Sequence, residues 1–236
     1  KLIKSMNMNA VRLSHYPADP EFLDACDSLG LYVECELPGW HWAHGTIVGS
    51  QLAEEMVTRD CNHPSIIFWS NGNEGGFNYD LEPVFHRFDL QQRVVLYPWA
   101  NRNGFETKHY RSWGETAEYM RQKEIFMPTE FLHGLYDGGH GAGLKDYWHL
   151  MMSNPRCAGG FLWDLMDQGV VRTDMNGLVD CMGNFASDGI VGPHMEKEGS
   201  YYTIREIWCP VQISREGNRL KVANHYDFTS LKDCRF

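Results

Sequence analysis

Long apolar runs, paired cysteines and excess positive charge are all missing from this sequence. The longest apolar stretches are a few residues, as at Ile66 to Trp69, far short of the roughly 20 that a transmembrane helix needs. Lys and Arg number 21 against 31 Asp and Glu, a net charge of −10, which repels nucleic-acid phosphates and anionic lipid. Nucleic acid and membrane are therefore excluded as partners. The seven cysteines include no C-x-x-C pair, so neither a zinc ribbon nor a disulfide framework is indicated, and we expect mostly buried thiols.

Apolar and aromatic side chains are plentiful by comparison. Apolar residues make up 43% of the 236 and charged residues 22%, which allows a sizeable core and argues against a disordered chain. Eight Trp and eleven Tyr exceed what such a core needs, and this surplus suits a site that stacks on a flat, half-apolar ligand. Carbohydrate is therefore the first partner that the composition indicates.

Short β-rich runs alternate with helical patterns over most of the chain, which is typical of parallel βα units. Asp19 is a predicted N-cap, Pro20 takes the first helical position, and Gly30 ends the helix. Two more helices are predicted around residues 52–57, ending before Pro64, and around residues 144–151, ending at Asn154. Strands are predicted at residues 10–16, 31–37, 66–69, 94–98, 107–110, 125–131 and 160–165.

Seven strands in parallel βα order predict an α/β barrel of the TIM type, which has eight strands and typically about 250 residues. We expect residues 1–205 to form this barrel without its first strand and helix. Residues 1–8 have neither an initiator Met nor a signal-peptide pattern, so we expect an interior piece of a longer protein and predict no localisation. Two alternating runs, 211–214 and 220–224, predict a hairpin. Residues 206–236 are predicted to begin a β-sandwich, because so short a piece is not a stable β domain alone.

Two glutamates stand at matched positions behind predicted strands. Glu74 follows the buried run 66–70, and Glu130 follows Phe126 to Thr129 three strands later. The carboxyl ends of barrel strands form the face where active sites lie, and strands three apart are nearly opposite. Two carboxylates facing each other are what glycoside hydrolysis requires. The alternative for either residue alone is a solvated loop position.

At this point the sequence resembles glycoside hydrolase family 2, in unbroken order over about 200 residues. The resemblance is carried by the strings NAVRLSHYP at 9–17, CDSLGLYV at 26–33, NHPSIIFW at 62–69, GNE at 72–74, TEFLH at 129–133, and GGFLWD at 159–164 with Asp167-Gln168. It implies the TIM-barrel domain of a retaining β-glycosidase. Within the family, the β-galactosidase branch is the most similar.

The resemblance implies roles for the two glutamates. Glu74 falls on the family's acid/base and Glu130 on its nucleophile, so their carboxyl groups should lie roughly 5–5.5 Å apart. Glu74 must then stay protonated at working pH, and we expect its pKa to be raised from about 4.3 to between 6 and 7 by burial or by the charge of Glu130. Arg12 resembles the family arginine that keeps the nucleophile charged.

Further positions match residues that bind the sugar. Asn73 resembles the asparagine that binds the sugar 2-hydroxyl, and Tyr110 the tyrosine that hydrogen-bonds the nucleophile. His15 and His133 resemble galactoside-binding histidines, and Trp163 resembles the tryptophan at the floor of the sugar site. The alternatives are a turn residue for Asn73, core packing for Tyr110, structural histidines, and packing at the barrel mouth for Trp163.

The sequence departs from the family at its metal positions. The family's Glu-x-His-Gly magnesium loop reads GWHWAHG at 39–45, with Trp42 in place of the acid. Magnesium prefers carboxylates and water, so no cofactor is expected to be required, and we interpret the aromatic segment as a wall of a sugar subsite. Asp188 stands where the family has an asparagine, which leaves a sodium or substrate contact open. The glycine-rich residues 138–143 lack a phosphate-loop ending and predict a mobile loop at the active site.

The sequence predicts a retaining exo-β-glycosidase that acts on terminal β-galactosides. A β-glucuronidase or β-galacturonidase of the same family is the nearest alternative, with Arg102 or Lys108 to hold the sugar carboxylate. A carbohydrate-binding barrel without catalysis is the alternative of another class. Further β-sandwich domains are expected as partners, and a homo-oligomer is left open.

Overall fold

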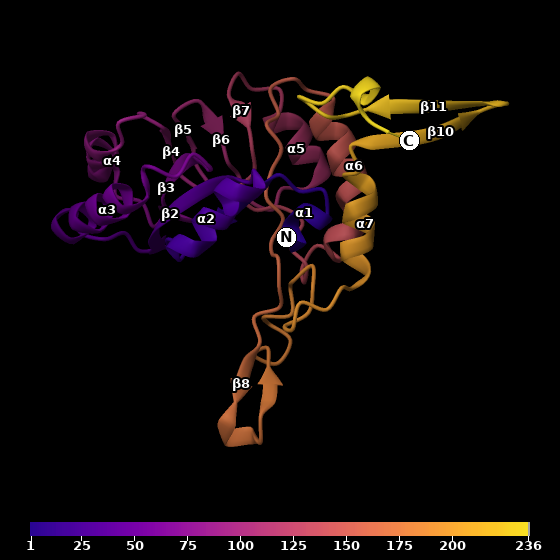
Figure 1. Ribbon diagram of the computed structural model, residues 1–236. Helices are drawn as coiled ribbons and strands as arrows, with labels where there is room; N and C mark the ends of the chain where they lie inside the picture. The colour runs from indigo at the N-terminus through magenta and orange to yellow at the C-terminus, as the bar shows by residue number, and fades with distance from the viewer. Residues whose placement is uncertain (236) are drawn as a thin grey trace.

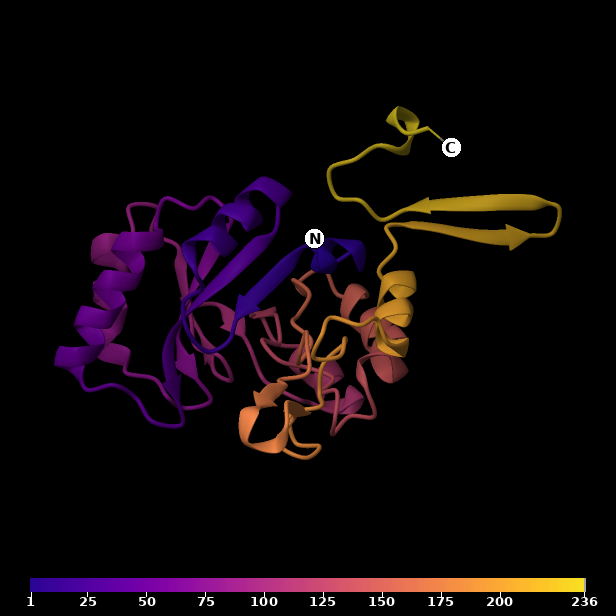
Figure 2. The same ribbon diagram turned by 60° about the horizontal axis from the view of Figure 1, so that its bottom comes forward.

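The computed structural model describes residues 1–235 and is shown in Figure 1. Two hairpins project from one compact body (Figures 1 and 2). The helices are α1 (Leu2–Ser5), α2 (Pro20–Leu29), α3 (Thr46–Asp60), α4 (Glu82–Phe88), α5 (Trp113–Tyr119), α6 (His140–Met152) and α7 (Gly199–Ile207). In this part of the chain, none of them has the length and apolar character to cross a membrane.

The first half of the body is a continuous parallel sheet with the order β1-β2-β3-β4. Its strands are β1 (Ala10–Leu13), β2 (Tyr32–Trp40), β3 (Ile66–Asn73) and β4 (Val94–Leu96). The sequence predicted all four, because each combines β-branched and apolar residues between turn signals. In β2, Glu34 and Glu36 alternate with the apolar Val33, Cys35 and Leu37, so the two faces of a buried strand differ in polarity.

The second half has much shorter strands. They are β5 (Asn101–Arg102), β6 (Phe105–Glu106) and β7 (Ile125–Phe126), with β6 parallel to β7. The strand predicted at 107–110 is wrong, since the ladder lies just before it. The strand predicted at 125–131 ends at Phe126, and 160–165 is reduced to a parallel bridge from Leu162 to Phe131. The amino-acid composition of these three segments predicts an extended backbone, but they form few hydrogen bonds to neighbouring strands.

Helix signals predicted the helices more closely. Asp19 accepts a hydrogen bond from the Glu21 backbone as the N-cap of α2, and Gly30 ends that helix in the left-handed conformation with φ 64°. Helix α6 begins at His140, so only the first part of the loop predicted at 138–143 precedes it. Of the seven cysteines, all free, only Cys26 and Cys35 are fully buried.

The core has three parts. The largest lies around β1–β4 with α2 and α3, and a second lies under α6 and α7. These two helices lie side by side in both views, with the rings of Trp148 and Trp208 5.3 Å apart. A small third cluster of Leu96, Phe105 and Met127 joins the two halves where β4 gives way to β6 and β7.

The two projecting hairpins differ in how well the sequence predicted them. The hairpin of β10 (Val211–Glu216) and β11 (Arg219–Asn224) is confirmed, antiparallel as expected. The hairpin of β8 (Val170–Arg172) and β9 (Leu178–Asp180) was not predicted, because its runs are only three residues long. Residues 206–235 of the predicted second domain are described, and residue 236 lies outside the described residues.

Candidate active site

Glu74 stands directly after the last residue of β3 on a backbone bend that glycines allow. A Cβ on Gly76 would lie 2.6 Å from the backbone of Gly39, and a Cβ on Gly39 would lie 2.6 Å from the Gly76 carbonyl oxygen. Gly72 has φ 76° and faces the same carbonyl. Glu74 itself has φ 43°, a left-handed conformation that costs a non-glycine residue energy and is found at functional sites. The bend turns Asn73 and Glu74 inward from the end of the sheet.

Glu130 comes from the other half of the molecule and lies next to Glu74. One carboxylate oxygen of Glu74, one of Glu130 and a ring nitrogen of His109 all lie within 4.8 Å of one another. Glu130 is only 4% exposed. The two glutamates that the sequence placed across the barrel mouth are thus close enough for both to contact one small group between them.

Arg12 of β1 holds Glu130 in place. Its Nη1 donates to Glu130 Oε1 at 2.6 Å and to the Thr129 carbonyl at 3.2 Å, while its Nη2 donates to Asn73 Oδ1 at 2.7 Å. Nε and Nη2 both donate to Oε2 of Glu36, at 2.9 and 2.6 Å. Burial alone would lower the pKa of Arg12, but the charges of Glu36 and Glu130 raise it above its usual value. The side chain is a fixed cation rather than a surface charge.

Glu34 lies beneath this network without a hydrogen bond. It is opposite Arg12 in the β1–β2 register, with Arg12 Nε 3.6 Å from its Oε1. Neither carboxylate oxygen has a hydrogen-bond partner among the described residues. Burial raises the pKa of Glu34 to about 8 against the pull of Arg12, and the charge of Glu36 adds to the rise. Burial thus favours the neutral form of Glu34, while Glu36 and Glu130 accept the hydrogen bonds of the arginine.

Glu74 is held by different partners. Its Oε1 lies 3.0 Å from His109 Nδ1, and its Oε2 accepts a hydrogen bond of 3.0 Å from Trp40 Nε1. When His109 carries its proton on Nδ1, this hydrogen bond lowers the pKa of Glu74 to about 2, with Trp40 acting in the same direction and burial against it. In this arrangement the pKa of Glu74 is lowered instead of raised as the sequence led us to expect, because two N–H groups donate to its ionised carboxylate.

Tyr110 donates a hydrogen bond to Glu130 Oε2, while its backbone N–H donates to the Glu130 carbonyl at 3.1 Å. Its backbone has φ 49°. Burial, followed by the charge of Glu130, raises the pKa of Tyr110 above its usual value, so the hydroxyl remains a donor. Both oxygens of Glu130 are thereby engaged, one by Arg12 and one by Tyr110.

The remaining predicted residues extend the site to one side. The His15 ring stacks on Trp163 with centroids 5.3 Å apart, and Trp163 Nε1 donates to Asp188 Oδ2 at 2.9 Å. His133 Nε2 lies 3.5 Å from the same oxygen, and its ring is 5.4 Å from that of Tyr110. Burial lowers the pKa of His133. All nine residues singled out from the sequence therefore belong to one connected group.

The sequence reasoning missed three residues of this group, Glu36, His109 and Thr129, and it included Trp40 only as part of the aromatic segment 39–45. Glu36 had a usable signal, since a charged residue inside an apolar strand is rarely left without a partner. His109 had none beyond its place before Tyr110. Thr129 looks like an ordinary packing residue, and only the folded chain brings it to His109 and Trp40 to Glu74.

Two cationic residues were proposed to hold a sugar carboxylate. Arg102 is committed elsewhere, since its Nη2 donates to Glu82 at 3.0 Å and its guanidinium lies over the Tyr97 ring. Lys108 Nζ lies 5.8 Å from the centroid of Trp99. Trp99 follows Pro98, whose carbonyl accepts a hydrogen bond from the Glu74 backbone N–H, and Lys108 directly precedes His109 in the sequence.

The end of β2 and the residues after it bring nitrogen atoms to Glu74. Trp40 presents an N–H to Glu74, and His41 Nδ1 lies 3.0 Å from the Glu74 carbonyl. Trp42, which stands where the family has its acid, is 86% exposed. Hard cations need several oxygen ligands, and here the Oε2 of Glu74 is already taken by a nitrogen donor.

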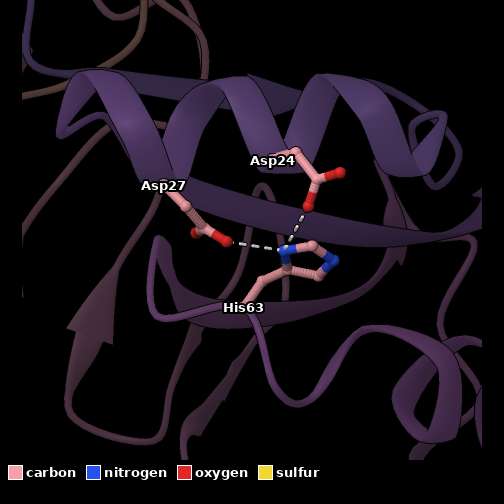
Figure 3. A group of neighbouring side chains, drawn as sticks. All are labelled: Asp24, Asp27 and His63. Carbon is pink, nitrogen blue, oxygen red and sulfur yellow. Dashed lines mark hydrogen bonds and ion pairs between the residues drawn. The ribbon is translucent and has the colours of Figure 1, made fainter.

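A second carboxylate group lies at the opposite end of the strands and is shown in Figure 3. Asp27 of α2 accepts from the Ser65 backbone at 2.9 Å and lies 2.7 Å from His63 Nδ1, while Asp24 is 4.0 Å from the same nitrogen. His63 precedes β3, so this is the N-terminal face, where a barrel is stabilised rather than active. Asp27 and His63 tie α2 to the sheet.

Comparison with known proteins agrees with this geometry. A family model described as "Glycosyl hydrolases family 2, TIM barrel domain" matches residues 1–189. A β-galactosidase of Oenococcus oeni is 32% identical over 213 residues, covering 75% of this chain and 20% of that protein. One of Priestia megaterium is 28% identical over 281 residues, covering 100% of this chain and 27% of that protein. The chain thus spans about a fifth to a quarter of these relatives.

Solved structures show the same fold. A β-glucuronidase of Faecalibacterium prausnitzii superposes with a TM-score of 0.64 at 23% identity, covering 88% of this chain and 44% of that one. A β-glucuronidase of Bifidobacterium dentium also gives 0.64, at 19% identity, covering 89% and 42%. At such identities the likeness concerns the fold alone. With the family match over residues 1–189, it identifies the chain as a member of glycosyl hydrolase family 2 that carries the family's TIM barrel domain.

Proposed function

We propose that this chain is the catalytic domain of a retaining exo-β-glycosidase that removes terminal β-galactosides by double displacement. The observation that carries the proposal is the pairing of the buried carboxyl group of Glu130 with the partly buried one of Glu74, with oxygens within 4.8 Å of each other. Retaining glycosidases have their two carboxyl groups about 5–5.5 Å apart, whereas inverting ones leave room for a water between them.

The unequal surroundings of the two carboxylates support different roles for them. Glu130 is fixed by Arg12 and Tyr110, which leaves it little freedom to move and suits attack on the sugar C1. Glu74 has no cation comparable to Arg12 beside it, so it suits proton transfer. In the first step Glu130 forms a bond to C1, the bond from C1 to the leaving oxygen breaks, and Glu74 gives its proton to that oxygen. In the second step Glu74 takes a proton from water, whose oxygen replaces Glu130 at C1.

The other residues support binding of the sugar. Asn73 is oriented by Arg12 through its Oδ1, which leaves its NH₂ to donate to a hydroxyl at C2. Trp163 donates its indole N–H to Asp188, and the His15 ring stacks on one face of the indole, so the other face is the one proposed for the sugar ring. His133 lies against the same Asp188 oxygen.

We further propose that the terminal sugar is a galactoside and not a sugar acid. The curated relatives are named β-galactosidases, and Arg102 is occupied by Glu82, which removes one of the two cations considered for a uronide. The solved neighbours are named β-glucuronidases, and Lys108 is the residue through which a sugar acid would be recognised. We favour galactosides because the curated relatives are named β-galactosidases and because Arg102 is already paired with Glu82.

We also propose that the reaction needs no metal ion, because the donors Trp40 and His41 surround Glu74 where a magnesium ligand set would lie. Exhaustive treatment with EDTA is then expected to leave kcat/KM unchanged. A loss of activity that Mg²⁺ restores would refute this part of the proposal.

Two proposals concern the domain arrangement. β1 has β2 as its one hydrogen-bonded neighbour among the described residues, whereas every strand of a closed barrel has two; this supports a further βα unit beside β1. In the β10–β11 hairpin, Ile213 and Leu220 are 63% and 73% exposed. Uncovered apolar residues on a two-stranded ribbon support residues 206–236 as the beginning of a β-sandwich domain.

The test of the catalytic proposal is covalent labelling of the intact protein by a 2-deoxy-2-fluoro-β-galactoside with a good leaving group. Mass spectrometry of peptides is expected to place the sugar on Glu130, with no adduct in Glu130→Gln. Glu118→Gln, at an exposed position of α5, is the matched control and should label like the wild type. Labelling only by the corresponding fluoro-glucuronide would overturn the galactoside preference, and labelling by neither would favour a binding barrel without catalysis.

A further inference from the structure

His109 connects the two carboxylates to the backbone behind them. The ring is only 2% exposed. Its Nδ1 lies 3.0 Å from Glu74 Oε1, and its Nε2 lies 2.8 Å from the hydroxyl oxygen of Thr129. Burial lowers the pKa of His109 despite the nearby carboxylates, so the ring is neutral and carries one proton, on either nitrogen.

The hydroxyl of Thr129 indicates which nitrogen carries that proton. It lies 3.3 Å from the carbonyl of Thr107, an acceptor that cannot donate. If the single hydroxyl proton goes to Thr107, then Nε2 must be the donor to Thr129. His109 Nδ1 is then left with a lone pair that faces Glu74. This contact is a hydrogen bond only if Glu74 supplies the proton.

The opposite arrangement loses one hydrogen bond. With the proton on Nδ1, His109 donates to an ionised Glu74, and Thr129 must turn its hydroxyl proton to Nε2. The Thr107 carbonyl then gives up its contact with Thr129. A buried polar group left without a partner destabilises the arrangement that contains it. In addition, Glu130 Oε2 lies 3.5 Å from Nδ1, so an ionised Glu74 would add a second negative charge at this corner.

Resting on the proposed function, we propose that His109 is a positioning residue: in the free enzyme it is protonated on Nε2, and its Nδ1 accepts the acid proton of Glu74. The proton is held on Glu74 Oε1 until the leaving oxygen of the substrate takes it. Trp40 donates to the other oxygen, Oε2, in either state. Since two N–H donors would instead leave Glu74 ionised, the tautomer of His109 decides whether the free enzyme has an acid.

Several charged and titratable groups face this pair and define the background of any pH measurement. They are Arg12 of β1, His41 after β2, Tyr110 next to His109, and Glu130. None of them touches the Thr129 hydroxyl, whose partners are His109 and Thr107. Thr129 is therefore the position at which the tautomer can be changed without altering these charges.

The experiment compares Thr129→Val with Thr129→Ser in the intact protein. Valine removes the acceptor for Nε2–H, so the ring proton should move to Nδ1 and favour ionised Glu74. The upper limb of the pH profile of kcat/KM, which reports the acid of the free enzyme, is expected to move down by about one unit, with activity above pH 7 about tenfold lower. The loss should be large for alkyl galactosides and small for dinitrophenyl galactosides, whose leaving group needs little protonation. Serine keeps the hydroxyl and should keep the limb.

A second variant, His109→Met, covers the case in which Thr129→Val folds poorly. If Nδ1 accepts the proton, removing the ring moves the upper limb to lower pH; if Nδ1 donates, removing it moves the limb to higher pH. An unmoved limb in Thr129→Val, or an upward shift in His109→Met, would overturn the assignment. Fluoro-sugar labelling of Glu130 with a dinitrophenyl leaving group needs no acid proton, so it tests the proposed function separately in the same variants.

Discussion

The two halves of the body are built differently, and each supplies one of the two carboxylates. Residues 10–96 form a continuous four-stranded sheet, whereas residues 97–191 have strands of two or three residues and single bridges. Glu74 belongs to the first half but is held by His109 of the second. Glu130 belongs to the second half but is held by Arg12 of the first. The anchoring is crossed.

Because each carboxylate is held by a residue of the other half, the site forms only when both halves are folded together. The regular half supplies a cation at a fixed place in a sheet, and the irregular half supplies donors on loops, which is the usual source of residues that contact a substrate. Each carboxylate has its partner from the other half only when the two halves pack together, and the small core of Leu96, Phe105 and Met127 lies between them.

Cutting the link from the regular half should have the largest effect. Arg12→Lys keeps the charge but loses the forked contacts to Glu36, Glu130 and Asn73. Each charge-assisted hydrogen bond contributes about 1.5–3 kcal/mol, so we expect kcat/KM to fall by on the order of 10²-fold or more. Steady-state kinetics on an aryl galactoside measures this.

Arg93→Lys is the matched control for that variant. Arg93 is equally buried, at 8% exposed, and is paired with Asp89 at 2.6 Å at the other end of the same sheet. The Arg93→Lys variant should lower the melting temperature about as much as Arg12→Lys does, while leaving kcat/KM of the folded protein unchanged. Equal kinetic losses in the two variants would mean that Arg12 acts only through stability.

Cutting a link within the irregular half should cost less. Tyr110→Phe removes the hydroxyl that donates to Glu130 Oε2 and leaves the Arg12 contact in place. We expect kcat to fall about 10- to 100-fold, the value of one hydrogen bond to a charged group. Tyr147→Phe, whose hydroxyl donates to the Arg111 carbonyl at 2.8 Å, serves as control. A loss in Tyr110→Phe as large as that in Arg12→Lys would remove the distinction between the halves.

The smallest effect is expected at Glu34 and concerns stability. Its pKa of about 8 in the folded protein exceeds the ordinary 4.5, so the folded state holds a proton that the unfolded state releases. Stability therefore falls as pH rises from about 4.5 through 8. Glu34→Gln mimics the neutral form and should match the wild type near pH 5, but melt at a higher temperature near pH 8.5. Glu54→Gln, exposed on α3, should show no such divergence, and parallel melting curves for Glu34→Gln would exclude the raised pKa.

The difference between the halves also explains how far the sequence could predict the fold. In the regular half, β2 and β3 have strong local signals, and α2 has both a cap and a terminating glycine, so strands and helices were predicted within a few residues. In the irregular half, the backbone is held by side chains and single bridges, and residues 107–110 and 160–165 have strand-like composition without a ladder. Local propensity does not record where a distant partner lies.

The site divides in the same way. Glu74 and Glu130 were predictable because each follows an apolar strand in matched positions. Arg12 and the sugar-binding residues required the family resemblance. The contacts of His109, Trp40 and Glu36 with their partners depend on distances set by folding, and so does the pKa of Glu74, whose expected rise left out the contacts with Trp40 and His109.

The close backbone contact of Gly39, Gly72 and Gly76 has a consequence for attempts to change the substrate range. Any side chain at Gly39 or Gly76 would meet backbone rather than a flexible neighbour, so randomising these positions would mostly yield inactive clones by displacing Glu74. Lys108 is only partly buried and Trp99 is exposed. A mutant library concentrated on this pair would therefore sample new specificities while sparing the bend that aims the acid.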